Sequence, residues 1–325
     1  MPKKDRNALL ALLFIVLFVA PIVLNDPYVT FVLNNMTVNI VLVMALNFVL
    51  GFAGQVFLGT VGFFAVGCYA TALLTTKAGL TFWQAVPVTV LTTAALAFVL
   101  GLPTLKLRGF YLALMSLGFI IVVGDVLKNW TSLTNGVWGV MGIPRPVIAG
   151  HAIDTNVEFY YMALVIALAL VVFAVLIEDS RFGRAFKVVR DDELAGEMLG
   201  IDPLRTKLLA FVMCGVYTGV AGSLFASFQR FISPEIYTFD YNSLFMCMLV
   251  VGGLSSVPGS VLGASLLTTL TELLRFMREK YLTVYAILIL ITLIYQPGGL
   301  VMALRNAYYW VLVRLPRAGK AASTR

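Results

Sequence analysis

Apolar stretches that approach or reach the length of a membrane span recur along the whole chain, separated by short polar segments. A membrane-crossing helix needs roughly 20 mostly apolar residues. Ten segments fit this pattern: 8–25, 28–50, 58–76, 83–102, 110–127, 158–178, 207–228, 241–254, 259–275 and 281–296. The pattern predicts an all-α, polytopic transmembrane helical bundle of about ten spans, within a range of eight to ten.

One junction leaves the number of spans open. Residues 241–275 form either one long helix or two short ones. Gly252-Gly253 and the segment 255–259, which contains Pro258, favour a break, since clustered glycine and proline punctuate helices.

Composition supports lipid as the solvent for much of the chain. Hydrophobic residues make up 60% and charged residues 12% of the 325 positions, whereas soluble domains carry about 25% charged residues. No stretch reads as a separate soluble domain. Residues 1–325 are therefore predicted to form a single transmembrane domain.

The formal net charge of +7 agrees with a membrane orientation better than with nucleic-acid binding, because the basic residues lie in short loops and at the chain ends. Ten spans place both termini, the loop 179–207 and the basic tail 301–325 in the cytoplasm. The cations at 275–280 are an exception, because they lie on the outer side. The apolar run from Ala8 to Leu24 lacks a small-residue cleavage pattern and is predicted to be a retained helix rather than a signal peptide.

Metal and redox chemistry are not indicated. Cys68, Cys214 and Cys247 lie singly in apolar segments, and His151 is the only histidine. Few carboxylates lie deep in any span, which lowers the probability of a proton- or sodium-coupled carrier. Energy for active transport would then enter from outside the membrane domain. The chain has no phosphate-binding GxxxxGK[ST] loop of its own.

Two segments are unusually polar for their depth, 34–69 and 242–263. Each combines an early asparagine with a glycine-rich break, and matching broken helices often mark a substrate site. The alternative is that the glycines allow close helix packing. The candidate pathway residues are Asn35, Asn39, Asn47, Gly51, Gln55, Thr60, Gly252 and Gly253.

The predicted cytoplasmic loop contains a short helix near 191–199. Asp191 or Asp192 can cap its first turn, and Gly200 supplies the stop signal. Leu194 and Met198, like Ala195 and Leu199, lie four residues apart and form an apolar face. Ala195 and Gly196 are small enough for a partner to approach. The face is interpreted as a docking surface, and a helix lying on lipid headgroups is the alternative.

These residues resemble the coupling loop of ABC importer permeases, and more closely the branched-chain amino-acid permeases of the LivM type. The loop motifs are 183–185, 190–193, 195–197 and 200–201. Further motifs of the family follow in order over roughly residues 35 to 300. They lie at 46–59, 105–119, 129–144, 207–211, 232–234, 252–254 and 297–300.

The resemblance implies a permease subunit that forms half of the translocation path of an ATP-driven importer in a bacterial inner membrane. Its partners would be a second related permease, two cytoplasmic ATPases and a periplasmic binding protein. The chain itself would bind no cofactor, and ATP with Mg²⁺ would bind to the ATPases. The residues implied in coupling are Arg190, Asp192, Glu193, Leu194, Ala195, Glu197, Met198 and Gly200.

The chain departs from the family pattern at two places. Ser255-Ser256 follows Gly-Gly-Leu where family members commonly carry Gly-Ser, and Thr60 stands where histidine is frequent. The ligand could therefore differ from leucine, isoleucine and valine, with urea and short amides as related ligands. A secondary carrier or facilitator for small amino acids, urea or amides is the competing function.

Overall fold

A computed structural model describes residues 3–24, 26–104, 107, 109–148 and 150–274, together with 287, 290, 299 and 302. The predicted span 281–296 and the basic tail 301–325 lie almost wholly outside the described residues. So do the cations at 275–280 and those at positions 106 and 108.

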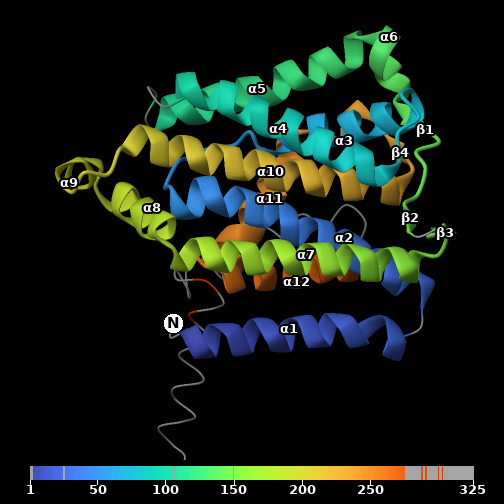
Figure 1. Cartoon of the computed structure of the whole chain (residues 1–325), viewed down its shortest axis with the longest axis horizontal. Coiled ribbons are helices and arrows are strands. Elements are labelled where there is room, and N and C mark those ends of the chain that lie inside the picture. The colour runs from blue at the N-terminus through green and yellow to red at the C-terminus, as the bar shows by residue number, and fades with distance from the viewer. Residues whose placement is uncertain are drawn as a thin grey trace, which may run out of the picture.

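Helices dominate the described part of the chain and run roughly alongside one another (Figure 1). Seven helical segments within it are long and apolar enough to cross a membrane, and two apolar helices are shorter. The long ones are α1 (Lys3–Leu24), α2 (Pro27–Leu46) with its π-helical extension η1 (Asn47–Phe52), α4 (Phe82–Thr104), α5 (Phe110–Asn129), α7 (Asn156–Asp179), α10 (Pro203–Gln229) and α12 (Val257–Leu274); the shorter ones are α3 (Thr60–Thr76) and α11 (Phe239–Gly252). The chain is thus a polytopic helical membrane protein, and a helix occupies each of the nine predicted spans between residues 8 and 275.

Short elements gather at the two ends of the bundle (Figure 1). One end, the α9 end, carries α8 (Arg181–Asp191) and α9 (Glu193–Met198). The opposite end, the strand end, carries four two-residue strands that pair antiparallel, β1 with β4 and β2 with β3. Its elements are α6 (Thr131–Thr134), η2 (Gly136–Trp138), β1 (Val140–Met141), β2 (Val147–Ile148), β3 (His151–Ala152), β4 (Phe231–Ile232) and η3 (Pro234–Ile236).

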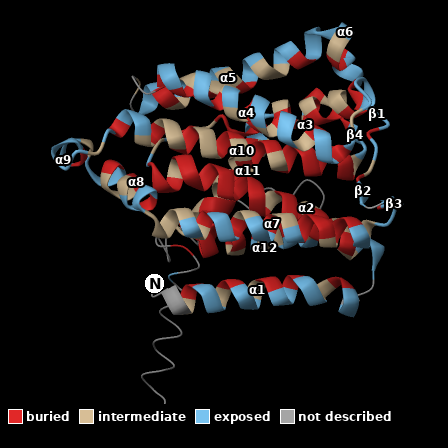
Figure 2. Cartoon of the chain, in the orientation of Figure 1, coloured by how far each residue is buried: buried red, intermediate tan, exposed pale blue. Residues whose placement is uncertain are grey.

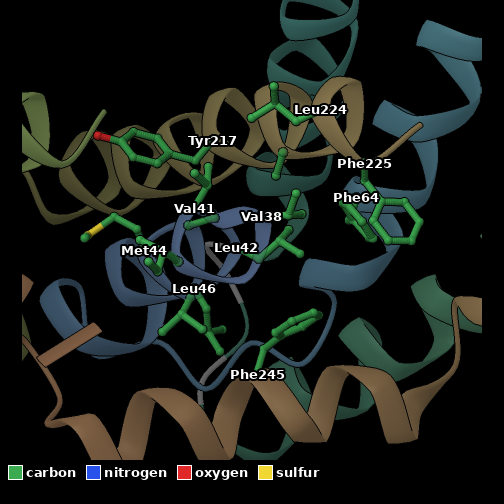
Figure 3. Close-up of a cluster of buried hydrophobic side chains, with 14 of the residues drawn as sticks. Val38, Val41, Leu42, Met44, Leu46, Phe64, Tyr217, Leu224, Phe225 and Phe245 are labelled. Carbon is green, nitrogen blue, oxygen red and sulfur yellow. The ribbon is translucent and has the colours of Figure 1, made fainter. Parts of the chain in front are cut away.

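The core lies where α2 and α10 pass through the middle of the bundle, and these helices carry the most buried residues (Figure 2). Figure 3 shows side chains that fill it, among them Val41 of α2, which lies near Tyr217 of α10. Small residues bring α10 close to its neighbours; a Cβ at Gly222 would lie 2.7 Å from the backbone of α3. Such close approach gains the van der Waals contact that drives helix association in lipid.

The segment 239–274 forms two helices, α11 and α12, as the glycine and proline pattern favoured. Between them Gly253 has φ +122° and Ser255 has φ +59°. A positive φ interrupts a right-handed helix and is readily adopted only by glycine. Pro258 then occupies the first turn of α12, where its missing N–H leaves no helical bond unmade.

The outermost helix, α1, is tied to α7. Near its start the Arg6 guanidinium makes two hydrogen bonds of 2.9 and 2.7 Å to the Asp179 carboxylate. Near its other end Leu17 O accepts a 2.7 Å bond from the Tyr160 hydroxyl. These polar anchors add to the packing of Leu10, Phe14 and Leu17, which are buried against the rest of the bundle.

Candidate functional site

The short helix α9 stands at the outermost tip of the α9 end (Figure 1). Asp192 caps it, its carboxylate accepting from the N–H groups of Leu194 (2.9 Å) and Ala195 (3.2 Å). Gly200, at φ +77°, ends it. The sequence prediction of a capped helix with a glycine stop is confirmed, with Asp192 as the cap rather than Asp191.

The apolar residues of α9 are exposed. Leu194 is 68%, Met198 88% and Leu199 71% exposed, and Ala195 and Glu197 are exposed beside them. Gly196 is a correction to the predicted face: it is buried, and a Cβ there would lie 3.6 Å from Val188 and Val189 of α8. Gly196 therefore faces α8 and is not available for the approach of a partner.

An ion pair between two charged residues attaches α9 to the bundle. The Glu193 carboxylate, in the first turn of α9, accepts a 2.5 Å bond from the ammonium of Lys207 on α10. The Lys207 side chain is only 2% exposed. The pair therefore joins the first turn of α9 directly to α10. Lys207 was not among the predicted functional residues.

Arg190, at the end of α8, contacts the broken segments rather than the exposed tip. Its Nη1 lies 2.5 Å from Ser255 Oγ and 3.5 Å from Gly51 O. The aliphatic stem passes over Gly54, where a Cβ would lie 2.5 Å from Arg190 Cγ. The loop that carries α9 is therefore joined to both glycine-rich breaks.

The two breaks that the sequence singled out meet in space, and we call Asn47, Gly51, Ser255 and Ser256 the junction. Asn47 Oδ1 accepts from Ser255 N at 3.1 Å, and Asn47 Nδ2 donates to Ser256 O at 3.3 Å. The Ser255 hydroxyl donates to Gly51 O at 2.5 Å. One asparagine side chain thus satisfies the Ser255 N–H and adds a bond to the Ser256 carbonyl, which also accepts from Ser260 N at 3.0 Å.

The other predicted pathway residues do not gather at one place. Asn39 Nδ2 donates to Thr268 Oγ1 of α12 at 2.9 Å, whereas Asn35 Oδ1 accepts from Gln229 of α10 at 3.4 Å. Gln55 bonds to Ala53 O, and Thr60 is fully buried at the start of α3. The amides of Asn39 and Asn35 therefore link α2 to two different helices, α12 and α10.

Gly252 and Gly253 allow close backbone packing. Any Cβ at Gly252 would overlap the Gly259 carbonyl and lie 3.0 Å from Gly263 Cα. Gly299, the described member of the 297–300 motif, packs on Gly253, where its own Cβ would lie 2.5 Å from Gly253 Cα. These glycines agree with the packing alternative.

A cavity of about 400 Å³ lies toward the strand end, between α5, η3 and the start of α11. Its wall combines aliphatic and aromatic side chains with two carboxylates and one ammonium group. The lining residues are Leu117, Ile120, Ile121, Gly124, Asp125, Lys128, Pro234, Glu235, Tyr237, Thr238 and Phe239. The signal in the sequence was Asp125 followed by Lys128, charges at the end of an apolar helix.

Comparison with protein families finds one family model matching residues 28–295, described as the branched-chain amino acid transport system / permease component. The matched region runs from α2 beyond α12 and includes α9, the junction and the cavity. Helix α1 precedes it.

Curated relatives agree with this family. The high-affinity branched-chain amino acid transport system permease protein LivM of Salmonella typhimurium is 36% identical over 284 residues, covering 80% of this chain and 67% of the relative. LivH of the same type of system, from Escherichia coli K12, is 30% identical over 183 residues, 53% of this chain and 59% of its own. The autoinducer 2 import system permease protein LsrC of Yersinia enterocolitica is 30% identical over 153 residues, 45% of this chain and 41% of its own. No solved structure matches the chain.

Proposed function

Because the chain belongs to the family of branched-chain amino acid transport permease components, we propose that it forms half of the translocation path of an importer driven by ATP hydrolysis on separate chains. Like its relatives, it is a transport subunit and not an enzyme. ATP and Mg²⁺ would bind to the partner ATPases.

The observation that carries the proposal is the form of α9. Its end projects three large apolar side chains, Leu194, Met198 and Leu199, away from the bundle. Its base is held by the Lys207–Glu193 pair. An apolar tip on a rigidly rooted helix suits a groove in a partner protein, since exposed apolar patches mark interaction sites. The ATPase would occupy that groove.

The distribution of charge supports a cytoplasmic location for the α9 end. Basic side chains are dense there, as the positive-inside rule requires of a cytoplasmic face. They are Arg181, Arg184, Lys187, Arg190, Arg205 and Lys207. The strand end would then face the periplasm of a bacterial inner membrane and a binding protein, and the ten-span arrangement would return both termini to the cytoplasm.

The proposed cargo is a branched-chain or related amino acid. The LivM relatives, which match most of this chain, are permease proteins of high-affinity branched-chain amino acid transport systems. The cavity near the strand end suits such a molecule, because Asp125 or Glu235 could pair with an α-ammonium and Lys128 with an α-carboxylate. Ile120 and Ile121 would cover an aliphatic side chain. A second permease of the same family would complete the path on this side.

Purification in a mild detergent from the cells that make the protein tests the proposal. We expect an ATPase with a phosphate-binding loop and a second permease to co-purify. Variants with a disrupted α9 should lose the ATPase and keep the fold. A stable protein that purifies alone, and whose uptake stops on collapse of the proton gradient instead of ATP depletion, would identify a secondary carrier.

A further inference from the structure

Ser255 adopts a backbone conformation that is unusual for a residue with a side chain. Its φ is +59°, and it is one of three non-glycine residues with positive φ in the described part of the chain. For an L-residue this conformation brings Cβ close to the carbonyl oxygen and costs free energy that glycine avoids. Strained residues of this kind persist where surrounding contacts hold them, and they concentrate at functional sites.

The contacts that hold Ser255 come from two other segments. Its N–H donates to Asn47 Oδ1 on η1. Its hydroxyl donates to Gly51 O and accepts from Arg190 Nη1, each at 2.5 Å. Besides the direct 3.5 Å contact of Arg190 Nη1 with Gly51 O, the hydroxyl bridges the guanidinium of α8 and the Gly51 carbonyl through two short bonds, and a glycine at 255 would lack this bridge.

The surroundings of Arg190 also allow its bond to Ser255 to break. Its side chain is 32% exposed, and its Nε and Nη2 bond to Asp191 Oδ1 at 2.9 and 2.8 Å. If Nη1 leaves Ser255, the charge stays paired and partly hydrated, so release leaves no buried charge unpaired. Two residues later Asp192 caps α9, so a movement of α9 reaches Arg190 directly.

We propose that Arg190 and Ser255 form a latch that keeps the junction closed until α9 moves. Ser255 is a positioning residue: it holds the two breaks together and reports the position of α9 to them. The inference rests on the proposed function for what moves α9, but closure of the junction by this bond is a property of the chain alone. A two-state element of this type is what coupling to a partner requires.

Three variants separate the effect of the Ser255 hydroxyl from the effect of its backbone conformation. Ser255→Gly removes the hydroxyl and relieves the positive φ, so the protein should melt at the same temperature or higher. Ser255→Ala removes the hydroxyl and keeps the strain. Ser243→Ala is the matched control, since its hydroxyl bonds only within α11, to Phe239 O at 3.0 Å.

The primary readout is thiol labelling of the full chain in its native membrane. Val257→Cys, at a fully buried position beside the junction, is introduced in each background. We expect a small maleimide to react at least about fivefold faster when Ser255 is Gly or Ala than in the parent or the Ser243→Ala control. An unchanged labelling rate in Ser255→Gly would overturn the latch, whether or not an ATPase is found.

The second readout is transport by the complex in proteoliposomes. Loss of the latch should lower the ligand transported per ATP hydrolysed by at least about fivefold, without a lower melting temperature. Equal loss of transport and thermal stability would reduce Ser255 to a structural role. Failure of the parent complex to hydrolyse ATP would instead reject the proposed function and leave the labelling result to decide the latch.

Discussion

Helix α9 carries apolar side chains in a polar loop, and helix α2 with its extension η1 carries polar side chains in an apolar bundle. The two sets differ in whether they have partners within the chain. On α9, apolar residues on a charged loop stay exposed. On α2, polar amides in an apolar bundle are paired within the chain: Asn39 with Thr268, and Asn47 with the break after α11. The apolar side chains of α9 remain exposed and, under the proposed function, would be covered by another chain, whereas the buried amides already have partners within this chain.

This comparison predicts which substitutions each region should tolerate. Substitutions at the exposed apolar positions of α9, Leu194 and Met198, should change transport and spare stability, because these side chains are largely exposed. Substitutions around α2 and the breaks should change stability first, because the same groups hold helices together. Each of the following variants tests one side of this division.

The largest effect is expected at the closest backbone contact. Gly252→Val places a Cβ against the Gly259 carbonyl and the Gly263 backbone. Neither can yield without separating α11 from α12, so we expect a loss of more than about 3 kcal/mol in unfolding free energy or no accumulation in the membrane. Thermal unfolding in detergent measures it. Gly118→Ala is the control, because a Cβ there would have no atom of another element within 4 Å in the described part of the chain; similar loss in both would remove the packing explanation.

The double substitution Leu194→Asp with Met198→Asp should abolish coupling while the fold survives. Both side chains are exposed and apolar, and charges there would oppose burial in a groove. We expect at least about a thirtyfold loss of ATP-driven transport and of ATPase co-purification, with unfolding free energy changed by less than about 0.5 kcal/mol.

The matched control for α9 is Leu204→Asp, an exposed apolar residue just beyond the helix at the start of α10. It should leave ATPase binding within about twofold of the parent, since isolated exposed apolar residues carry little energy. Retention of transport by the double variant would show that the exposed face of α9 lies on lipid headgroups instead.

An intermediate effect is expected at the Lys207–Glu193 ion pair, which attaches α9 to α10. Lys207→Met removes one partner of an ion pair whose lysine is buried, and should cost about 1.5 kcal/mol, less than for a fully buried pair because Glu193 keeps some exposure. Arg205→Met, whose side chain is 88% exposed, should cost close to nothing. Chemical denaturation of both variants gives the difference. If they cost the same, the pair does not anchor α9.

Local patterns in the sequence predicted the elements well. Apolar runs identified a helix in each described span, and Asp192 and Gly200 delimited α9, because both signals act over a few residues. The two breaks were recognised at Gly51 and Gly252 but not their meeting, since Asn47 and Ser255 lie 208 residues apart. Partners across such distances depend on how helices pack, which periodicity does not encode.

Other features escaped because a single sequence carries little signal for them. Lys207 looked like one more cation of a basic loop, and only its burial against Glu193 distinguishes it. The cavity between α5 and η3 joins residues that are far apart in the sequence, such as Asp125 and Glu235. The spacing of Asn35, Asn39 and Asn47 places them on one side of a helix, yet they contact different neighbours, because α2 and η1 lie in the centre of the bundle.

The smallest effect should come from Asn39→Leu, and it is the most direct test of the division between α2 and α9. The loss of one hydrogen bond between helices in a membrane costs about 0.6 kcal/mol on average, and Thr268 can bond within its own helix instead. We expect a change of that size by thermal unfolding, the same change in Thr268→Val, and transport within about twofold of the parent. If transport falls more than about tenfold while stability changes this little, Asn39 acts on the substrate during transport, and its pairing with Thr268 is only one of two states.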